Sequence, residues 1–200
     1  MRHGKTLLIT AVFVACIPVW AGEQLLRFDP ETTDVSFFVN ATGHDFHGSL
    51  VLKEGQIRFD PQTGEASGKI TIDARRAETG NKKRDKKMHH KVLESEQYPL
   101  FRFVPTHIEG QLADSGTSEV TLHGTLSIRG DEHPLVLPTT VEMTDGHLKA
   151  NTTFPIPYVE WGMHNPSMLI LRVAKVVEVT ISTEGTLTDA RGPAQASLAN

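Results

Sequence analysis

Residues 120–128 read Val-Thr-Leu-His-Gly-Thr-Leu-Ser-Ile, with an apolar side chain at every second position except the central glycine. Successive side chains of a β-strand point to opposite faces, so a period of two predicts a strand with one buried face. Shorter runs with the same period recur throughout the chain, which we therefore predict to be all-β. They are Phe37/Val39, Leu50/Leu52, Ile57/Phe59, Ile70/Ile72, Phe101/Phe103, Leu135/Leu137, Val141/Met143 and Val177/Val179/Ile181.

Turn signals separate these runs. Residues 60–64 read Asp-Pro-Gln-Thr-Gly, in which proline presets φ and glycine accepts a positive φ. Gly130-Asp131 and Asp145-Gly146 are typical of tight hairpins. Short strands joined by such turns predict an antiparallel sandwich or barrel. A closed barrel of about eight strands leaves no edge, and its interior is either packed or holds one small ligand. Alternation marks burial in both cases, so it does not distinguish a packed interior from a cavity.

Composition excludes several classes of protein. The 200 residues suit a single domain, and at 38% hydrophobic they are too polar for a polytopic membrane protein and too apolar for wholesale disorder. The chain carries 20 basic and 24 acidic residues, so we expect no nucleic-acid partner. A single cysteine excludes an intramolecular disulfide framework and a cysteine-based zinc cluster.

The first residues predict an export signal. Arg2 and Lys5 precede an almost entirely apolar run at residues 7–19, which is shorter than the ~20 residues of a spanning helix. We expect residues 1–21 to be a signal peptide cleaved after Ala21, and the protein to be periplasmic or secreted. Loss of Arg2 and Lys5 would leave 18 basic and 24 acidic residues, a net charge of −6.

Cys16 offers a different processing route, because residues 13–16 weakly resemble a lipoprotein cleavage box. Phe13 fits that box poorly, so lipid anchoring at Cys16 is the less favoured prediction. The folded domain is then expected over residues 22–188. Residues 189–200 are small and polar, and we predict a disordered tail there.

One segment departs from the strand pattern. Residues 81–93 read Asn-Lys-Lys-Arg-Asp-Lys-Lys-Met-His-His-Lys-Val-Leu. Asn81 is a plausible N-cap, and Met88 and Val92 lie four residues apart on one face of a helix. We therefore predict one short helical insertion in the β-structure.

This helix would carry a dense positive charge. An anionic membrane surface or lipid headgroup would complement it, although a solvated helix face explains the same run of residues. The residues concerned are Lys82, Lys83, Arg84, Lys86 and Lys87.

Four histidines form the alternative functional hypothesis, a histidine-dependent metal-binding protein. His44 and His47 would need a turn between them, because residues three apart point to opposite faces of a strand. His89 and His90 are adjacent on the predicted helix and point in different directions. No His-Glu-x-x-His, Gly-x-Ser-x-Gly or glycine-rich phosphate loop occurs, so we predict no cofactor and no enzymatic activity.

Several short segments resemble a known family in their order and spacing. The segments are Thr79-Gly80-Asn81, Arg84-Asp85, Tyr98-Pro99 with Phe101 and Phe103, residues 57–61 (Ile-Arg-Phe-Asp-Pro), residues 126–130 (Leu-Ser-Ile-Arg-Gly) and Glu160-Trp161-Gly162. Together they resemble the YceI-like, polyisoprenoid-binding family of secreted bacterial proteins, from about Leu26 to about Leu187.

The resemblance implies a lipocalin-like antiparallel barrel with a helix at one side. It also implies an elongated apolar cavity that holds an isoprenoid or another long-chain lipid, with a binding role and no catalytic residue. The histidine-rich segments depart from the family pattern and leave the ligand open. The candidate ligand-binding residues are Phe37, Val39, Leu50, Leu52, Ile57, Phe59, Ile70, Ile72, Met88, Phe101, Phe103, Leu122, Leu126, Trp161, Val177 and Val179.

Overall fold

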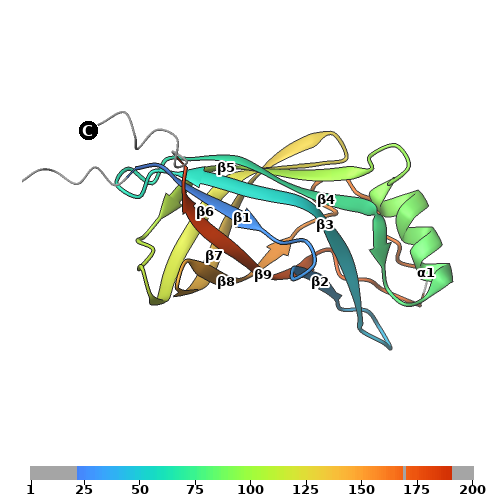
Figure 1. Cartoon of the computed structure of the whole chain (residues 1–200). Coiled ribbons are helices and arrows are strands. Elements are labelled where there is room, and N and C mark those ends of the chain that lie inside the picture. The colour runs from blue at the N-terminus through green and yellow to red at the C-terminus, as the bar shows by residue number, and fades with distance from the viewer. Residues whose placement is uncertain (1–21, 169, 191–200) are drawn as a thin grey trace, which may run out of the picture.

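The structure, a computed structural model, describes residues 22–168 and 170–190 (Figure 1). The predicted signal peptide, Cys16 and most of the predicted tail lie outside the described residues. The strands are β1 (Gln24–Phe28), β2 (Asp34–Val39), β3 (Phe46–Phe59), β4 (Ala66–Glu78), β5 (Leu100–Glu109), β6 (Gly116–Ile128), β7 (Asp131–Thr144), β8 (His147–Ile156) and β9 (Val177–Asp189). Between β4 and β5 lie the α-helix α1 (Lys82–Lys87) and the π-helix η1 (Met88–Leu93).

All strand pairs are antiparallel, and the sheet closes on itself. The order is β1-β3-β2-β9-β8-β7-β6-β5-β4, and β3 also pairs with β4. Both β1 and β2 pair with β3 on one side and β9 on the other, so these two short strands share one position in the wall. The result is an eight-position barrel with one helical insertion, which confirms the predicted fold class.

The tight turns use residues in the left-handed region. β6 and β7 are joined by Arg129 and Gly130, with φ of 54° and 88°, one residue earlier than the sequence suggested. β7 and β8 are joined by Asp145 and Gly146, with φ of 50° and 76°. Two positive φ values match the twist of the flanking strands, which fixes the register of each hairpin.

A β-bulge changes which residues of β3 face inward. Leu52 pairs with Ile72, and two residues further along β3, Glu54 pairs with Thr71. One additional residue in β3 reverses the alternation, so that Leu52 and Ile57 are both buried although they lie five positions apart. The predicted strand pairs Leu50/Leu52 and Ile57/Phe59 are therefore parts of one long strand.

The interior consists of two apolar clusters. One is packed and lies toward the end of the barrel where the described ends of the chain meet, with Ala190 donating its N–H to the carbonyl of Glu23 (2.8 Å, Figure 1). Its buried members are Leu26, Ile57, Phe59, Ile108, Val120, Val141, Met143, Leu148 and Ala150. The other surrounds a cavity near the helical end, so a packed core and a cavity occur in different halves of one barrel.

The glycine that interrupts the alternation of β6 has a packing role. A β-carbon at Gly124 would overlap the ring of Phe103 and the carbonyl oxygen of Val104 on β5. The missing side chain therefore lets the Phe103 ring lie across β6.

We expect Gly124→Val to destabilise the protein by about 1–3 kcal/mol, because neither the ring nor the backbone of β5 moves freely. The neighbouring Thr125→Val, on the opposite face of β6, is the control and should change stability by less than about 0.5 kcal/mol. Urea denaturation of both variants measures this difference. Equal stability of the two variants would contradict this packing role.

Candidate ligand-binding cavity

The helical half of the barrel encloses a cavity of about 230 Å³. It is only partly enclosed, and Arg84 and Lys87 are the only charged residues among those that line it in the described structure. Aliphatic and aromatic side chains make up nearly all of the remaining wall. Such a wall suits an apolar ligand and offers few polar groups to orient it.

Most of the predicted ligand-binding residues do line this cavity, although their contact with a ligand stays a prediction. They are Phe37, Val39, Leu50, Ile70, Ile72, Met88, Phe101, Phe103, Leu126, Val177 and Val179.

Five predicted ligand-binding residues lie elsewhere. Ile57 and Phe59 belong to the packed cluster, and Leu122 packs against both clusters without lining the cavity. Leu52 is buried but does not reach the cavity. Trp161 stacks on the ring of His133, with ring centroids 4.0 Å apart. Alternation shows which face of a strand is buried, but it does not show the depth of each residue along the barrel.

Some further lining residues carry little or no local signal, whereas Ile128, Leu135, Leu137 and Ile181 lie in the predicted alternating runs. Pro155 lies near the end of β8 and Pro157 directly follows it, so the strand pattern is hard to recognise there. Pro166 and Val173 belong to an irregular segment without periodicity. The lining residues absent from the prediction are Val35, Phe46, Val92, Leu93, Ile128, Leu135, Leu137, Phe154, Ile156, Tyr158, Met163, Pro166, Val173 and Ile181, together with the charged Arg84 and Lys87.

The helical insertion contributes to the cavity wall. The Asn81 side chain accepts hydrogen bonds from the backbone N–H groups of Lys83 (3.1 Å) and Arg84 (3.2 Å), which confirms the predicted N-cap. The helix changes from α to π at Met88. The wider π turn, with its i to i+5 hydrogen bonds, brings Leu93 onto the same face as Met88. Both side chains therefore reach the cavity.

Arg84 is held in place by the motif that precedes it. Its Nε donates to Thr79 Oγ1 (2.7 Å) and its Nη2 donates to the Thr79 carbonyl (2.8 Å). The Thr79 N–H and hydroxyl both donate to Asp85 Oδ1. The guanidinium also lies 4.3 Å from the centroid of the Phe46 ring, a cation–π contact. The segment that resembles the family motif therefore fixes α1 against the barrel wall.

Lys87 joins the helix to a distant part of the chain, since its Nζ donates to the carbonyl of Pro166 (2.7 Å). Arg84 and Lys87 are both half-buried, whereas Lys82, Lys83 and Lys86 are exposed. The predicted cationic face therefore divides into two cations that hold the fold together and three that face solvent.

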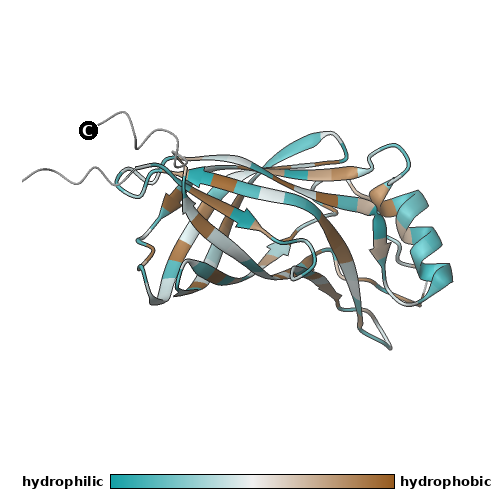
Figure 2. Ribbon diagram, viewed as in Figure 1, coloured by the Kyte–Doolittle hydropathy of each residue, from teal (hydrophilic) through white to brown (hydrophobic). Residues whose placement is uncertain are grey.

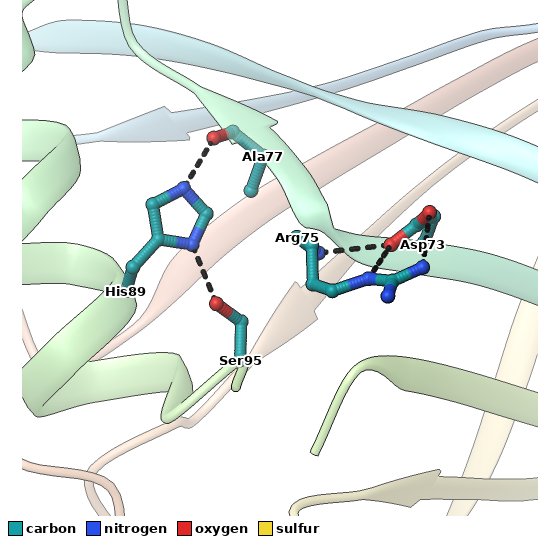
Figure 3. A network of polar contacts seen from close by, with 5 residues as sticks. All are labelled: Asp73, Arg75, Ala77, His89 and Ser95. Atoms are coloured by element: carbon teal, nitrogen blue, oxygen red, sulfur yellow. Dashed lines mark hydrogen bonds and ion pairs between the residues drawn. The ribbon is translucent and has the colours of Figure 1, made fainter. Parts of the chain in front are cut away.

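His89 attaches the π-helix to β4 (Figure 3). Its Nε2 lies 2.9 Å from the Ala77 carbonyl and its Nδ1 lies 2.7 Å from Ser95 Oγ. A carbonyl only accepts, so Nε2 carries a hydrogen, and in the neutral ring Nδ1 accepts from the Ser95 hydroxyl. The carbonyl is available because β4 loses regular pairing with β3 between Asp73 and Glu78.

The same view shows an ion pair on this irregular part of β4. Arg75 donates to Asp73 from Nε and Nη2, at 3.2 Å each (Figure 3). These hydrogen bonds lower the pKa of Asp73 and keep it ionised. Neither residue lines the cavity, so the pair supports the strand and not the binding site.

The metal hypothesis finds no support in this geometry. Both ring nitrogens of His89 are already hydrogen-bonded, and His47 packs its ring against Phe38 with centroids 4.8 Å apart. His44 and His90 are exposed. Within residues 22–168 and 170–190, no group of three or more histidine, cysteine, aspartate or glutamate side chains could hold a metal ion.

Tyr158 supplies the one phenol among the described residues that line the cavity. Its hydroxyl donates to the Ala174 carbonyl (2.8 Å), and burial raises its pKa to about 12. The phenol therefore stays neutral, and its hydrogen is used within the protein.

Another of the segments that resemble the family, residues 126–130, forms hydrogen bonds at the same end of the barrel. Arg129, at the β6–β7 turn, donates from Nη2 to Glu94 (2.9 Å) and from Nη1 to the Gly162 carbonyl (3.0 Å). Glu94 ends the π-helix in the left-handed conformation, with φ of 48°. Arg129 therefore joins the helix end to the segment that follows β8.

We expect His89→Phe to destabilise the protein by about 1–3 kcal/mol, because it leaves the Ala77 carbonyl and the buried Ser95 hydroxyl without their partner. The effect should concentrate in the helical segment, so hydrogen exchange should accelerate most there. His90→Phe alters the exposed neighbour and should leave both quantities nearly unchanged. Uniformly faster exchange over the whole barrel would contradict a local anchoring role.

In the described part of the chain, no helix is long and apolar enough to cross a membrane. A search of curated proteins finds no significant match. The YceI-like domain family matches residues 26–185.

Solved structures share this fold. BcnA from Burkholderia cenocepacia aligns with a TM-score of 0.64 and 20% identity, over 80% of this chain and 99% of its own. A Saccharophagus degradans domain, described as polyisoprenoid-binding and implicated in plant cell wall breakdown, aligns with a TM-score of 0.63 and 14% identity, over 82% and 98%. A Campylobacter jejuni YceI protein aligns with a TM-score of 0.52 and 18% identity, over 74% and 84%. These identities show the fold alone, whereas the family match spans most of the chain, and the protein therefore belongs to the YceI-like family.

Proposed function

We propose that this protein binds an isoprenoid or a similar long-chain lipid in the barrel cavity. The observation that carries the proposal is the lining, which is apolar except for two cations at the helical end and one internally bonded phenol. The description of the Saccharophagus degradans domain as polyisoprenoid-binding supports the same ligand class.

Transfer of the lipid's hydrocarbon chain from water into the cavity would supply the binding affinity. Each methylene transferred from water contributes up to about 0.8 kcal/mol, less the cost of ordering the chain. Apolar contact has no direction, so discrimination between ligands would depend on chain length and shape. A polar headgroup would remain near Arg84 and Lys87, the charged residues among the described residues of the lining.

The lining also favours binding over catalysis. Among the described residues that line the cavity, there is no histidine, carboxylate, serine or cysteine to act as nucleophile or general base. Arg84 and Lys87 are engaged with Thr79 and Pro166, and the Tyr158 hydroxyl with Ala174. The proposed role is therefore to hold or carry a lipid.

The proposed location is the periplasm or the exterior, because residues 1–21 have the pattern of a cleaved signal. The exposed Lys82, Lys83 and Lys86 would contact a membrane surface there. Arg84 and Lys87 are held within the fold and would contribute only their charge.

A variant that fills the cavity tests the binding site. We expect Leu135→Trp, which adds volume at a lining position, to lower the uptake of a polyprenol at least tenfold. Val136→Trp is the matched control, because the next residue of β7 is 51% exposed, and its uptake should equal that of the unchanged protein. Organic extraction followed by mass spectrometry measures bound lipid, and thermal melting verifies that both variants fold. Equal uptake by both variants, or no lipid in the unchanged protein, would contradict the proposal.

Processing can be tested separately. Expression in a bacterium with an intact export system should yield a chain that begins at Gly22, as read by intact mass and N-terminal sequencing. A chain that begins at an acylated Cys16 would instead support lipid anchoring. A chain that retains residues 1–21 would contradict both.

A further inference from the structure

The segment between β8 and β9 exposes an unusual concentration of apolar side chains. The described chain has six exposed large hydrophobic residues, and four of them lie between positions 168 and 176. They are Met168, Ile170, Leu171 and Val176, and Ile170 is 88% exposed. Single exposed hydrophobic residues are normal, but a group of them marks an interaction surface. We call the described residues 166–168 and 170–176 the apolar loop.

Hydrogen bonds hold the loop in this exposed conformation. Ser167 Oγ accepts from the Val173 N–H (2.8 Å), and the Met168 N–H donates to the Leu171 carbonyl (2.7 Å). The Thr42 N–H, in the segment between β2 and β3, donates to the Arg172 carbonyl (2.8 Å). The loop is therefore fixed to the barrel at Arg172, while Met168, Ile170 and Leu171 stay exposed.

The apolar loop lies beside α1 at the helical end of the barrel. The hydrogen bond from Lys87 to Pro166 joins the two, and Pro166 and Val173 also line the cavity. Figure 1 shows α1 and the neighbouring orange segment at the end opposite to the chain termini. The loop is therefore part of the rim of the cavity.

Exposed cations lie on the loop and on the adjoining helix α1. α1 exposes Lys82, Lys83 and Lys86, and in Figure 2 the ribbon of this helix has the teal colour of hydrophilic residues. The loop itself adds the exposed Arg172 and Lys175. The whole chain has a net charge of −4, so this concentration of cations is local.

Aliphatic side chains flanked by lysines complement one kind of surface closely. Lysines attract anionic lipid headgroups, and aliphatic side chains enter the boundary between headgroups and acyl chains. The adjoining cavity is lined for a lipid chain, which also favours a bilayer over a folded protein as the partner.

We propose that the apolar loop and the lysine face of α1 dock together on an anionic lipid bilayer. Docking in this orientation would turn the part of the cavity wall formed by the helix and the loop toward the membrane. A lipid could then move between the bilayer and the barrel without crossing water, a consequence that rests on the proposed lipid-binding function.

Vesicle co-sedimentation tests the docking surface. The purified protein should sediment with vesicles of phosphatidylglycerol and phosphatidylcholine, and binding should weaken at least tenfold with pure phosphatidylcholine or in high salt. Substitution of Met168, Ile170 and Leu171 by serine should weaken binding to the anionic vesicles at least tenfold. Replacement of Lys82, Lys83 and Lys86 by glutamine should weaken it on the order of 100-fold.

Matched controls separate a surface effect from a general one. Val104→Thr with Val136→Thr removes the remaining two exposed hydrophobic residues, and Lys53→Gln with Arg102→Gln removes exposed cations from the barrel wall. Both double variants should bind vesicles like the unchanged protein. All variants share the same N-terminus, so vesicle binding by residues 7–19 would be common to all of them and would not produce a difference.

The outcomes distinguish docking from ligand binding. The loop variant should still take up a soluble short-chain isoprenol, because the cavity wall is intact. If the protein takes up the isoprenol but does not bind anionic vesicles, the docking proposal is wrong and the proposed function is unaffected. Vesicle binding without any uptake of isoprenoids would support the docking proposal and contradict the proposed lipid-binding function. A third outcome is that the loop substitutions abolish self-association in gel filtration but leave vesicle binding unchanged. The surface would then join two copies of the chain, and the docking proposal would be wrong.

Discussion

Closure of the sheet through the pairing of β3 with β4 is the constraint on which the rest of this structure depends. Closure leaves no edge strand, although β4 is irregular between Asp73 and Glu78, and it directs one face of every strand into a single enclosed space. Two of the long strands keep an apolar inward face by changing their alternation partway along, whereas β6 alternates without interruption. The bulge in β3 achieves this, and β5 has a similar irregularity between Pro105 and His107.

The interior is filled to different extents in the two halves of the barrel. At the terminal end, side chains such as Ile57, Phe59 and Met143 fill the interior. At the helical end, polar contacts at the rim attach the covering segments in addition to the apolar packing of Val92 and Leu93. His89 bonds to a strand carbonyl, Arg84 to Thr79 and Lys87 to the carbonyl of Pro166. These attachments fix the cover without filling the interior, which leaves room for a ligand.

Much of the fold could be predicted because its signals are local. Alternation in residues 120–128, the Asp145-Gly146 turn and the Asn81 cap each depend on neighbours within a few residues, and the structure contains all three. β1 and β8 were not predicted from the sequence. β1 is a short strand that shares its place in the wall with β2, and Pro155 interrupts the recognisable pattern at the end of β8. The irregular apolar loop has no period at all, yet it completes the rim of the cavity.

The sequence by itself determined the strand faces, the turns and the helical insertion, since period, φ preference and capping are properties of short segments. Only the tertiary structure decided which buried side chains pack and which line the cavity. Ile57 and Ile72 have the same local pattern, but strand register places the first in the packed cluster and the second on the cavity wall. The histidines were ambiguous for the same reason. The partners of His89, on β4 and beyond the π-helix, are set by how distant segments meet, and they occupy both of its ring nitrogens.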